Sequence, residues 1–304
     1  MNIERQYLDL IAHVRNEGEE RIDRTGVGTR SIFGAMLKHD MSTWDFPTLT
    51  TKRVYWKTAV REMIWFLTGN TNIRPLVLQG VKIWNEWPHA SYVRTTGDEI
   101  SLEEFVDRIA ADEDFAAQWG DLGPVYGKQW VDWDTFEDNG DGTYRKGAGI
   151  NQIEQVIEGL KTNPAGRRHI VEGWNVAQLE GMALPPCHKS YQFHVSNGRV
   201  NSMLYQRSCD MFLGLPFNLV GQAVLTAMIA QQAGMEVGEL VWSGGDVHVY
   251  LNHLDAIDEQ LERVPGELPK LTLSHKPSIN SYTIEDFLLD GYNPQESIKA
   301  PVAV

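Results

Sequence analysis

The chain has 304 residues, of which 42% are hydrophobic and 10% aromatic, a globular rather than a disordered composition. Its 41 acidic and 27 basic residues give a formal net charge of −14, which argues against a broad basic surface for nucleic acid. No apolar run approaches the roughly 18 residues of a membrane span, and no secretory signal begins the chain, so we expect a cytoplasmic protein. Two cysteines are too few for a disulfide framework.

Helices are expected to dominate the first half of the chain. Apolar residues at helical spacing predict helices over residues 3–15, 56–69 and 151–162, and Gly69 ends the second of them. Residues 30–39 have the pattern of a strand. The acidic and polar stretch 88–120 is interpreted as a surface insertion with one helix, and the turn residues 138–142 separate two more ordered segments.

Strands follow from residue 168 onward. Residues 168–174, 190–195 and 199–207 are rich in β-branched and aromatic residues, and Asn197-Gly198 is predicted as the hairpin turn between the last two. An apolar helix is expected over residues 218–233, followed by a strand-like segment, 240–243, and the motif 245–253. The pattern predicts an α+β fold with a substantial sheet, in one domain over residues 1–304.

Cys187 is the candidate nucleophile of the chain. It follows two prolines and precedes a predicted strand, so its approach is rigid, and nearby arginines would favour the reactive thiolate. Cys209 lacks such an approach and is expected to be a buried small apolar residue. His188 is a possible base, but adjacent residues on a strand point to opposite faces, which disfavours a direct pair with Cys187.

Four arginines in turn-like or strand-edge motifs point to a phosphate site, since the guanidinium fork matches phosphate oxygens. They are Arg24, Arg167, Arg168 and Arg207. No Walker or dinucleotide glycine pattern is present, so the expected ligand is a nucleotide monophosphate held by side chains. Ordinary surface ion pairing is the alternative for any single arginine.

Three further motifs each allow a structural and a functional interpretation. Asn218 is either a helix N-cap or a carboxamide that reads a pyrimidine edge. His248 and Tyr250 are two residues apart and share a strand face, whereas a metal site of His248 with His253 lacks a convincing third ligand. Trp84 and Trp87 flank a carboxylate and either pack in the core or contact a flat aromatic ligand.

Together these motifs resemble the thymidylate synthase family over nearly the whole chain. The similarity is carried by DRTGVGT (23–29), TTKR (50–53), GNTN (69–72), IWNEW (83–87), GDLGPVYGKQW (120–130), GRRHIVEGWN (166–175), ALPPCH (183–188), YQRSCDMFLGLPFN (205–218), GGDVHVYLNH (244–253) and IKAPVAV (298–304). Each motif alone is weak to moderate, but ten in order are specific. The resemblance implies a layered α+β fold, with a mixed twisted sheet flanked by helices and packed against its mate in a two-fold homodimer.

The resemblance also implies a reaction and its residues. The reaction is reductive methylation of dUMP to dTMP, with 5,10-methylenetetrahydrofolate giving the carbon and the hydride and with no metal, membrane or nucleic acid required. Cys187 would add to C6 of dUMP, and Arg167 and Arg168 would reach the phosphate from the other subunit. The implied catalytic residues are Cys187, Glu62, Tyr126, His188, Arg207 and Asn218. The implied dUMP ligands are Arg24, Arg167, Arg168, Arg207, Ser208, Asp210, Asn218, His248 and Tyr250. The implied folate ligands are Ile83, Trp84, Trp87, Asp210, Leu213, Gly214, Phe217 and Val304.

Several positions depart from the family pattern and keep an alternative open. Asn70 and Asn85 stand where aspartates are usual, and Gly221 and Gln222 replace a usual Ser and Tyr. The alternative is a dUMP hydroxymethylase, in which water replaces the hydride; a dCMP version is less favoured because cytosine would favour a carboxylate at Asn218. RNA binding is disfavoured by the net charge, and a cysteine hydrolase by the lack of a recognisable triad. The intact tail 299–304 would exclude water and favours dTMP.

Overall fold

The computed structural model describes residues 2–22 and 26–302, and the chain forms two compact units. Unit 1 comprises residues 1–60, 157–170 and 187–304, and unit 2 comprises residues 61–156 and 171–186. The boundaries fall within helix α2 (Trp56–Leu67), helix α8 (Gln152–Thr162) and strand β5 (Ile170–Glu172). Within the described ranges, no helix has both the length and the apolar character needed to cross a membrane.

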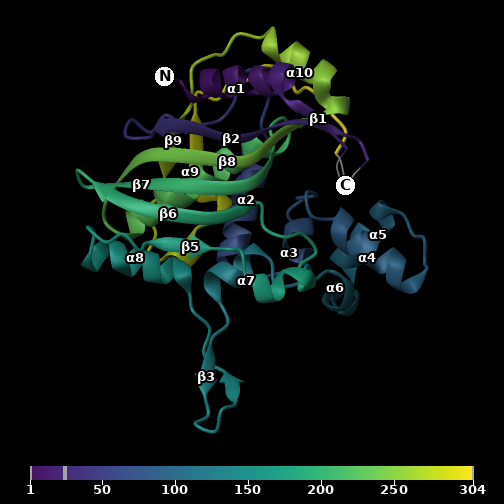
Figure 1. Cartoon of the computed structure of the whole chain (residues 1–304), viewed down its shortest axis with the longest axis vertical. Helices are drawn as coiled ribbons and strands as arrows, with labels where there is room; N and C mark the ends of the chain where they lie inside the picture. The colour runs from purple at the N-terminus through teal and green to yellow at the C-terminus, as the bar shows by residue number, and fades with distance from the viewer. Residues whose placement is uncertain (1, 23–25, 303–304) are drawn as a thin grey trace. The chain divides into compact units, whose positions relative to one another are not determined.

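Unit 1 is built on a twisted sheet whose strands run in the order β1-β2-β8-β7-β6 (Figure 1). Neighbouring strands are antiparallel except for β7 and β8, which are parallel. The elements of this unit are α1 (Ile3–Glu17), β1 (Glu19–Arg21), β2 (Thr29–Asp40), β6 (His188–Ser196), β7 (Arg199–Asp210), α9 (Gly214–Gln232), β8 (Glu236–Tyr250), η2 (Leu251–His253), α10 (Leu254–Leu261), β9 (Lys270–Leu273), η3 (Ile279–Ser281), η4 (Ile284–Asp286) and β10 (Phe287–Asp290).

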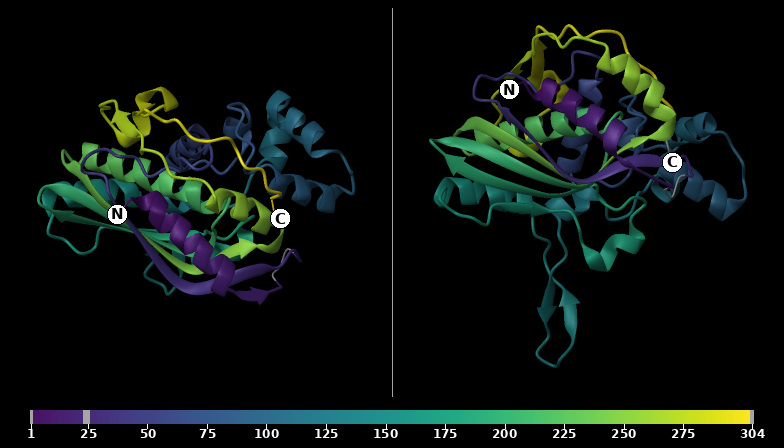
Figure 2. Two further views of the ribbon diagram at one scale, coloured as in Figure 1. Left: turned by 90° about the horizontal axis from the view of Figure 1, so that it is seen from above. Right: turned by 45° about the horizontal axis from the view of Figure 1, so that its top comes forward.

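Helix α9 forms the core of unit 1 together with the sheet. Most of its residues are fully buried, as expected of a helix that is apolar on every side, and it packs along β7 and β8 behind the sheet in Figure 1. Figure 2 shows the same helix lying along one sheet face. Among the described residues of this unit, no helix covers the opposite face where Met36, Met203 and Tyr205 are exposed.

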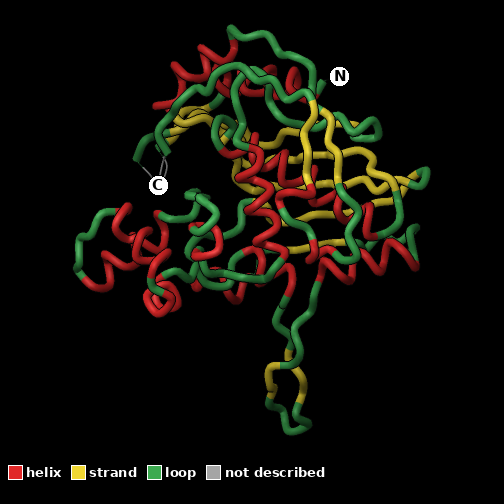
Figure 3. The backbone as a smooth tube through the Cα atoms, turned by 180° about the vertical axis from the view of Figure 1, so that it is seen from behind, coloured by secondary structure: helices red, strands yellow, loops and turns green. Residues whose placement is uncertain are grey.

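Unit 2 is mainly helical, as Figure 3 shows by colour. Its elements are α3 (Arg74–Val77), α4 (Glu86–Thr96), α5 (Leu102–Ala111), α6 (Glu113–Trp119), α7 (Tyr126–Val131), η1 (Val176–Gly181) and the antiparallel strands β3 (Phe136–Asp138) and β4 (Tyr144–Lys146). The β3–β4 hairpin extends away from α7 (Figure 1), and most of the predicted turn residues 138–142 lie in the loop between its two strands.

The strongest sequence patterns are confirmed by the structure. Helices α1, α2 and α8 cover the predicted helical stretches, and β2 covers the predicted strand 30–39. Asn197 and Gly198 join β6 to β7 with φ angles of 52° and 72°. Two successive positive φ angles match the right-handed twist of the paired strands, which is why Asn-Gly is favoured there.

Other expectations needed correction. Stretch 88–120 contains α4, α5 and α6 rather than one helix, because Ser101 and Asp112 each cap a short helix through their side chains. Asn218 is not an N-cap: α9 begins at Gly214. Of the predicted strand 168–174 only β5 is formed, whereas 240–253 is largely one continuous strand, β8.

Candidate active site

Cys187 lies just before β6, next to an arginine on the neighbouring strand β7. The Arg207 backbone N–H donates to the Cys187 carbonyl at 3.0 Å, and an Arg207 Nη2 group lies 4.0 Å from the Cys187 Sγ atom. The thiol is half-buried, and a neighbouring cation favours its thiolate form. Cys209 is fully buried, and this burial raises the pKa of its thiol well above its usual range. The prediction that Cys209 is a buried small residue is confirmed.

Asn218, in the second turn of α9, is held by a buried glutamine of β7. The Gln206 Nε2 group donates to the Asn218 Oδ1 atom at 2.7 Å, and the Trp242 Nε1 group donates to the Gln206 Oε1 atom at 2.9 Å. An indole N–H can only donate, so it fixes the Gln206 carbonyl, and the Gln206 amide must then donate to the Asn218 oxygen. The carboxamide orientation of Asn218 is therefore set by Trp242 through Gln206.

His188 also contacts Asn218 and is held in its neutral form. Burial lowers the pKa of His188 to about 4, and the hydrogen bond between His188 and Asn218 acts weakly in the opposite direction. At neutral pH this imidazole carries no charge. It therefore contributes hydrogen bonding near Asn218 rather than a cation beside Cys187.

His248 and Tyr250 lie side by side on β8, as predicted, with ring centroids 5.4 Å apart. The His248 Nδ1 group is 2.8 Å from the Asp246 Oδ1 atom, and this hydrogen bond holds the pKa of Asp246 below its usual range. A carboxylate only accepts hydrogen bonds. His248 therefore carries a proton on Nδ1.

The strand register places two more predicted residues beside this pair. Ser208 pairs with Asp246 and Asp210 pairs with His248. The Asp210 Oδ1 atom accepts hydrogen bonds from the Phe212 and Leu213 backbone N–H groups at 2.9 and 3.2 Å. Asp210 thereby shapes the turn that leads into α9, where Leu213, Gly214 and Phe217 are half-buried.

Arg167 and Arg168 are exposed on the loop that follows α8. That loop lines a pocket of about 530 Å³ formed by Asn163, Gly166, Arg167, Arg168 and His169. Arg24 and Val304, which were also predicted as site residues, lie outside the residues that the structure describes.

The predicted tryptophan pair of unit 2 belongs to an aromatic cluster around Glu62. Ring centroids of Trp84 and Trp87 are 5.3 Å apart, and those of Trp84 and Tyr126 are 6.0 Å apart. The Trp84 Nε1 group donates to the Glu62 Oε1 atom at 2.7 Å. Glu62 is half-buried as a residue, but its carboxyl is enclosed by protein. Burial raises the pKa of this carboxyl to about 7, and the hydrogen bond from Trp84 acts in the opposite direction. Beside this cluster Ile83 is 36% exposed.

Gln222, one of the departures from the family pattern, is fully buried between α9 and the sheet. Its Nε2 group donates to the Ser202 Oγ atom at 3.1 Å and to the Val241 carbonyl at 3.0 Å. Gln222 therefore links α9 to β7 and β8 through hydrogen bonds.

Three residues with positioning roles were missed by the sequence reasoning: Gln206, Trp242 and Asp246. Gln206 and Asp246 stand inside quoted motifs, and Asp246 is two residues before His248 on the same strand face. Trp242 carried no local signal, because its contact with Gln206 joins residues 36 positions apart. Among the described residues, no group of three or more His, Cys, Asp or Glu residues is placed to hold a metal ion.

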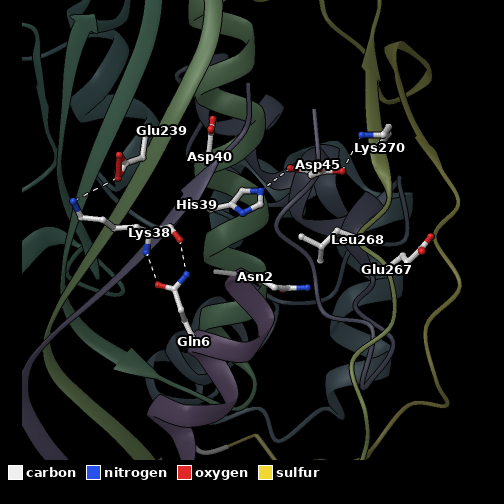
Figure 4. Close-up of a pocket in the computed structure, with 10 residues that line it drawn as sticks. All are labelled: Asn2, Gln6, Lys38, His39, Asp40, Asp45, Glu239, Glu267, Leu268 and Lys270. Carbon is white, nitrogen blue, oxygen red and sulfur yellow. Dashed lines mark hydrogen bonds and ion pairs between the residues drawn. The ribbon is translucent and has the colours of Figure 1, made fainter. Parts of the chain in front are cut away.

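A separate surface pocket of about 760 Å³ lies at the other end of β2 and β8 (Figure 4). It is lined by Asn2, Gln6, Lys38, His39, Asp40, Asp45, Glu239, Glu267, Leu268 and Lys270, none of which is a predicted site residue. The charged side chains of this pocket are largely paired. The Lys38 Nζ atom is 3.5 Å from the Glu239 Oε1 atom, and the Lys270 Nζ atom is 2.9 Å from the Asp45 Oδ1 atom.

Comparison with known proteins agrees with the motifs. The family model described as Thymidylate synthase matches residues 5–304. A protein named thymidylate synthase from Novosphingobium aromaticivorans is 60% identical over 98% of this chain and 96% of its own length. Proteins of the same name from Rhizobium rhizogenes and Sphingopyxis alaskensis are 57% and 55% identical over 99% and 100% of this chain, and over 98% and 99% of their own lengths.

Proposed function

Because the chain belongs to the thymidylate synthase family, we propose that it methylates dUMP to dTMP with 5,10-methylenetetrahydrofolate as co-substrate. The predicted family and enzyme class, a methyltransferase, are confirmed by the comparisons. The observation that carries the proposal is the Cys187 thiol beside the Arg207 guanidinium. That arrangement supports a thiolate able to add to C6 of the uracil.

Addition of the thiolate turns C5 of the uracil into an enolate carbon, and the base must be held while charge develops at O4. With its Oδ1 atom turned toward Gln206, Asn218 would accept from uracil N3–H through the same oxygen and donate from Nδ2 to O4. This donor and acceptor order matches uracil and opposes cytosine, which has an N3 acceptor and an N4 donor.

The phosphate and the sugar would be bound by the remaining predicted residues. Arg207 and Ser208, with Arg24, would hold the phosphate, whose oxygens match the guanidinium fork. His248 would bind the deoxyribose hydroxyl through Nε2, with Tyr250 beside it. This assignment is supported by the Asp246 carboxylate, which holds the His248 proton on Nδ1.

The residues of the predicted folate site fit a flat aromatic ring. The half-buried Trp87 beside the buried Trp84, together with the partly exposed Ile83, offers an apolar surface of that shape. When bound, the folate supplies one carbon and a hydride. Glu62 would hold or release a proton near neutral pH, because its pKa is about 7. Leu213, Gly214, Phe217 and Val304 remain predicted folate ligands.

A homodimer is part of the proposal, with the open sheet face of unit 1 as the interface. Met36 and Tyr205 both pair with Ser243 of β8, and Met203 pairs with Val241, so the exposed apolar side chains of β2 and β7 lie on either side of β8. Met36, Met203 and Tyr205 are 51%, 38% and 38% exposed, and such patches mark protein contacts. The exposed Arg167 and Arg168 would then reach the phosphate of the dUMP bound to the partner subunit. The expected compartment of the protein is the cytoplasm.

The experiment is a product analysis. Purified protein is mixed with dUMP and methylenetetrahydrofolate. Formation of dihydrofolate is followed by absorbance, and the mass of the nucleotide product is measured by mass spectrometry. The expected result is dTMP with one dihydrofolate per turnover. A nucleotide heavier by one oxygen, formed without dihydrofolate, would instead identify the hydroxymethylase, which the comparisons do not favour.

A further inference from the structure

His253 joins the C-terminal segment to the residues proposed to bind the sugar of dUMP. The His253 imidazole is fully buried, and its Nε2 group lies 2.7 Å from the Pro301 carbonyl oxygen. On its other sides the imidazole lies 5.4 Å from the Tyr250 ring and 5.6 Å from the Phe212 ring, between centroids. Tyr250 in turn contacts His248. One buried ring therefore contacts Pro301, Tyr250 at the end of β8 and Phe212 in the turn before α9.

The chemistry of this contact fixes which atom donates. A backbone carbonyl only accepts hydrogen bonds, so the proton must be on Nε2 of His253. The His253 Nδ1 atom is buried and has no hydrogen-bond partner among the described residues. Burying a polar nitrogen in this way has a cost in free energy. The hydrogen bond from Nε2 is thus the single polar contact that the described structure gives this ring, and it is made to the tail.

We propose that His253 is a positioning residue that fastens the C-terminal tail beside the nucleotide site. Nothing else in the proposed mechanism uses His253, and no metal role is needed to explain its burial. The inference rests on the proposed function, in which Val304 contacts the folate. Because Pro301 is held by His253, less conformational entropy is lost when Val304, three residues further along the chain, contacts the ligand.

Two matched variants separate the hydrogen bond from the packing. His253→Phe keeps an aromatic ring against Phe212 and Tyr250 but removes the donor. His253→Gln removes the ring but keeps an N–H donor on a side chain of similar reach. Both are compared with the wild type by thermal unfolding, which verifies that each variant is folded.

The first measurement needs no substrate: carboxypeptidase is added to the free enzyme, and loss of residues 302–304 is followed by mass spectrometry. We expect His253→Phe to be trimmed roughly five to ten times faster than the wild type, the factor that corresponds to one lost buried hydrogen bond. His253→Gln should stay within about twofold of the wild type. Equal trimming of His253→Phe and the wild type, or equal acceleration in both variants, would overturn the proposal.

The second measurement is kinetic. In His253→Phe, kcat/KM for methylenetetrahydrofolate should fall by a similar factor of about five to ten, while the dissociation constant for dUMP in the absence of folate changes less than about twofold. A loss of dUMP affinity equal to the loss in folate kcat/KM would mean a general defect of the nucleotide site and would contradict the proposal. If the wild type formed no dTMP at all, the proposed function would fail, whereas the trimming experiment would still decide the role of His253.

Discussion

The Nε2 group of Gln206 donates a 2.7 Å hydrogen bond to the Oδ1 atom of Asn218, and the Trp242 indole holds the carbonyl end of the same glutamine. Asn218, which is proposed to read the base, is therefore oriented by a residue that has no direct role in the proposed mechanism. Of the three, Asn218 is half-buried, whereas Gln206 and Trp242 are buried at 2% and 1% exposure. Under the proposed function, selection between uracil and cytosine would depend on these two buried side chains.

Replacing Gln206 by glutamate is expected to shift the base preference without any change at Asn218. A carboxylate still accepts from the Trp242 indole, but it presents an acceptor to Asn218, whose carboxamide must turn its Nδ2 group inward. The turned carboxamide offers a donor to N3 and an acceptor to the exocyclic amine, which matches cytosine. We expect the ratio of kcat/KM for dUMP over dCMP to fall by about tenfold or more, the effect of one mismatched hydrogen bond. Gln206→Met is the control, since it frees Asn218 without reversing it, and an unchanged ratio in Gln206→Glu would contradict the orienting role.

Asn218→Asp is expected to change the same preference directly. A carboxylate accepts from the cytosine amino group but offers no donor to uracil O4. Activity on dUMP should fall by at least tenfold, and activity on dCMP should become measurable relative to it. The assay is competition between the two nucleotides with product analysis. If both nucleotides lost activity in equal proportion, Asn218 would not read the base.

Cys187→Ala should abolish turnover while leaving dUMP binding largely intact. The phosphate, sugar and base contacts are proposed for other residues, so only the covalent step is lost. Binding is measured by calorimetry and turnover by dihydrofolate absorbance. Cys209→Ala is the matched control and should stay active, because Cys209 is buried in the sheet. Retention of even a tenth of the activity in Cys187→Ala would exclude it as the nucleophile.

Trp84→Phe should move the Glu62 titration to higher pH. The Trp84 indole stabilises the charged carboxylate, so its loss raises further a pKa that burial already places at about 7. The pH profile of kcat should show an inflection near 7 in the wild type and a higher one in the variant, and no such inflection in Glu62→Gln. If the inflection stayed at the same pH in Trp84→Phe, Glu62 would not be the group that causes the pH dependence.

The raised pKa of Glu62 also has a consequence for stability. A carboxyl has an ordinary pKa near 4.5, so between that pH and about 7 the folded chain binds more protons than the unfolded chain. Stability therefore falls as the pH rises through this window. Urea unfolding of Glu62→Gln should show less of this fall than the wild type.

Local sequence patterns predicted the elements that depend on local physics. The spacing of Leu8, Ile11 and Val14 placed α1, and Asn197-Gly198 placed the β6–β7 turn, because helix periodicity and turn chemistry are encoded within a few residues. The three helices of stretch 88–120 were not separated, since Ser101 and Asp112 have loop-like composition and act as caps only in context.

The candidate site was predicted only in part, for a similar reason. Cys187, Asn218, His248 and Tyr250 stand in dense motifs and could be found from the sequence. Their supports could not, because the contact of Trp242 with Gln206 and that of His253 with Pro301 each join residues more than 30 positions apart. Polar residues buried by tertiary contacts look like surface residues in a sequence.

Strand β2 pairs along its whole length with β8, from Thr29 opposite Tyr250 to Asp40 opposite Glu239. During synthesis on the ribosome, β2 is therefore made about 200 residues before its partner strand, β8. At roughly 5–20 residues per second, that interval is on the order of 10–40 s. Until then β2 has no neighbour on the side that later joins β8, and exposed Phe33 lies within it. The nascent chain is thus most vulnerable to aggregation in the interval before β8 emerges.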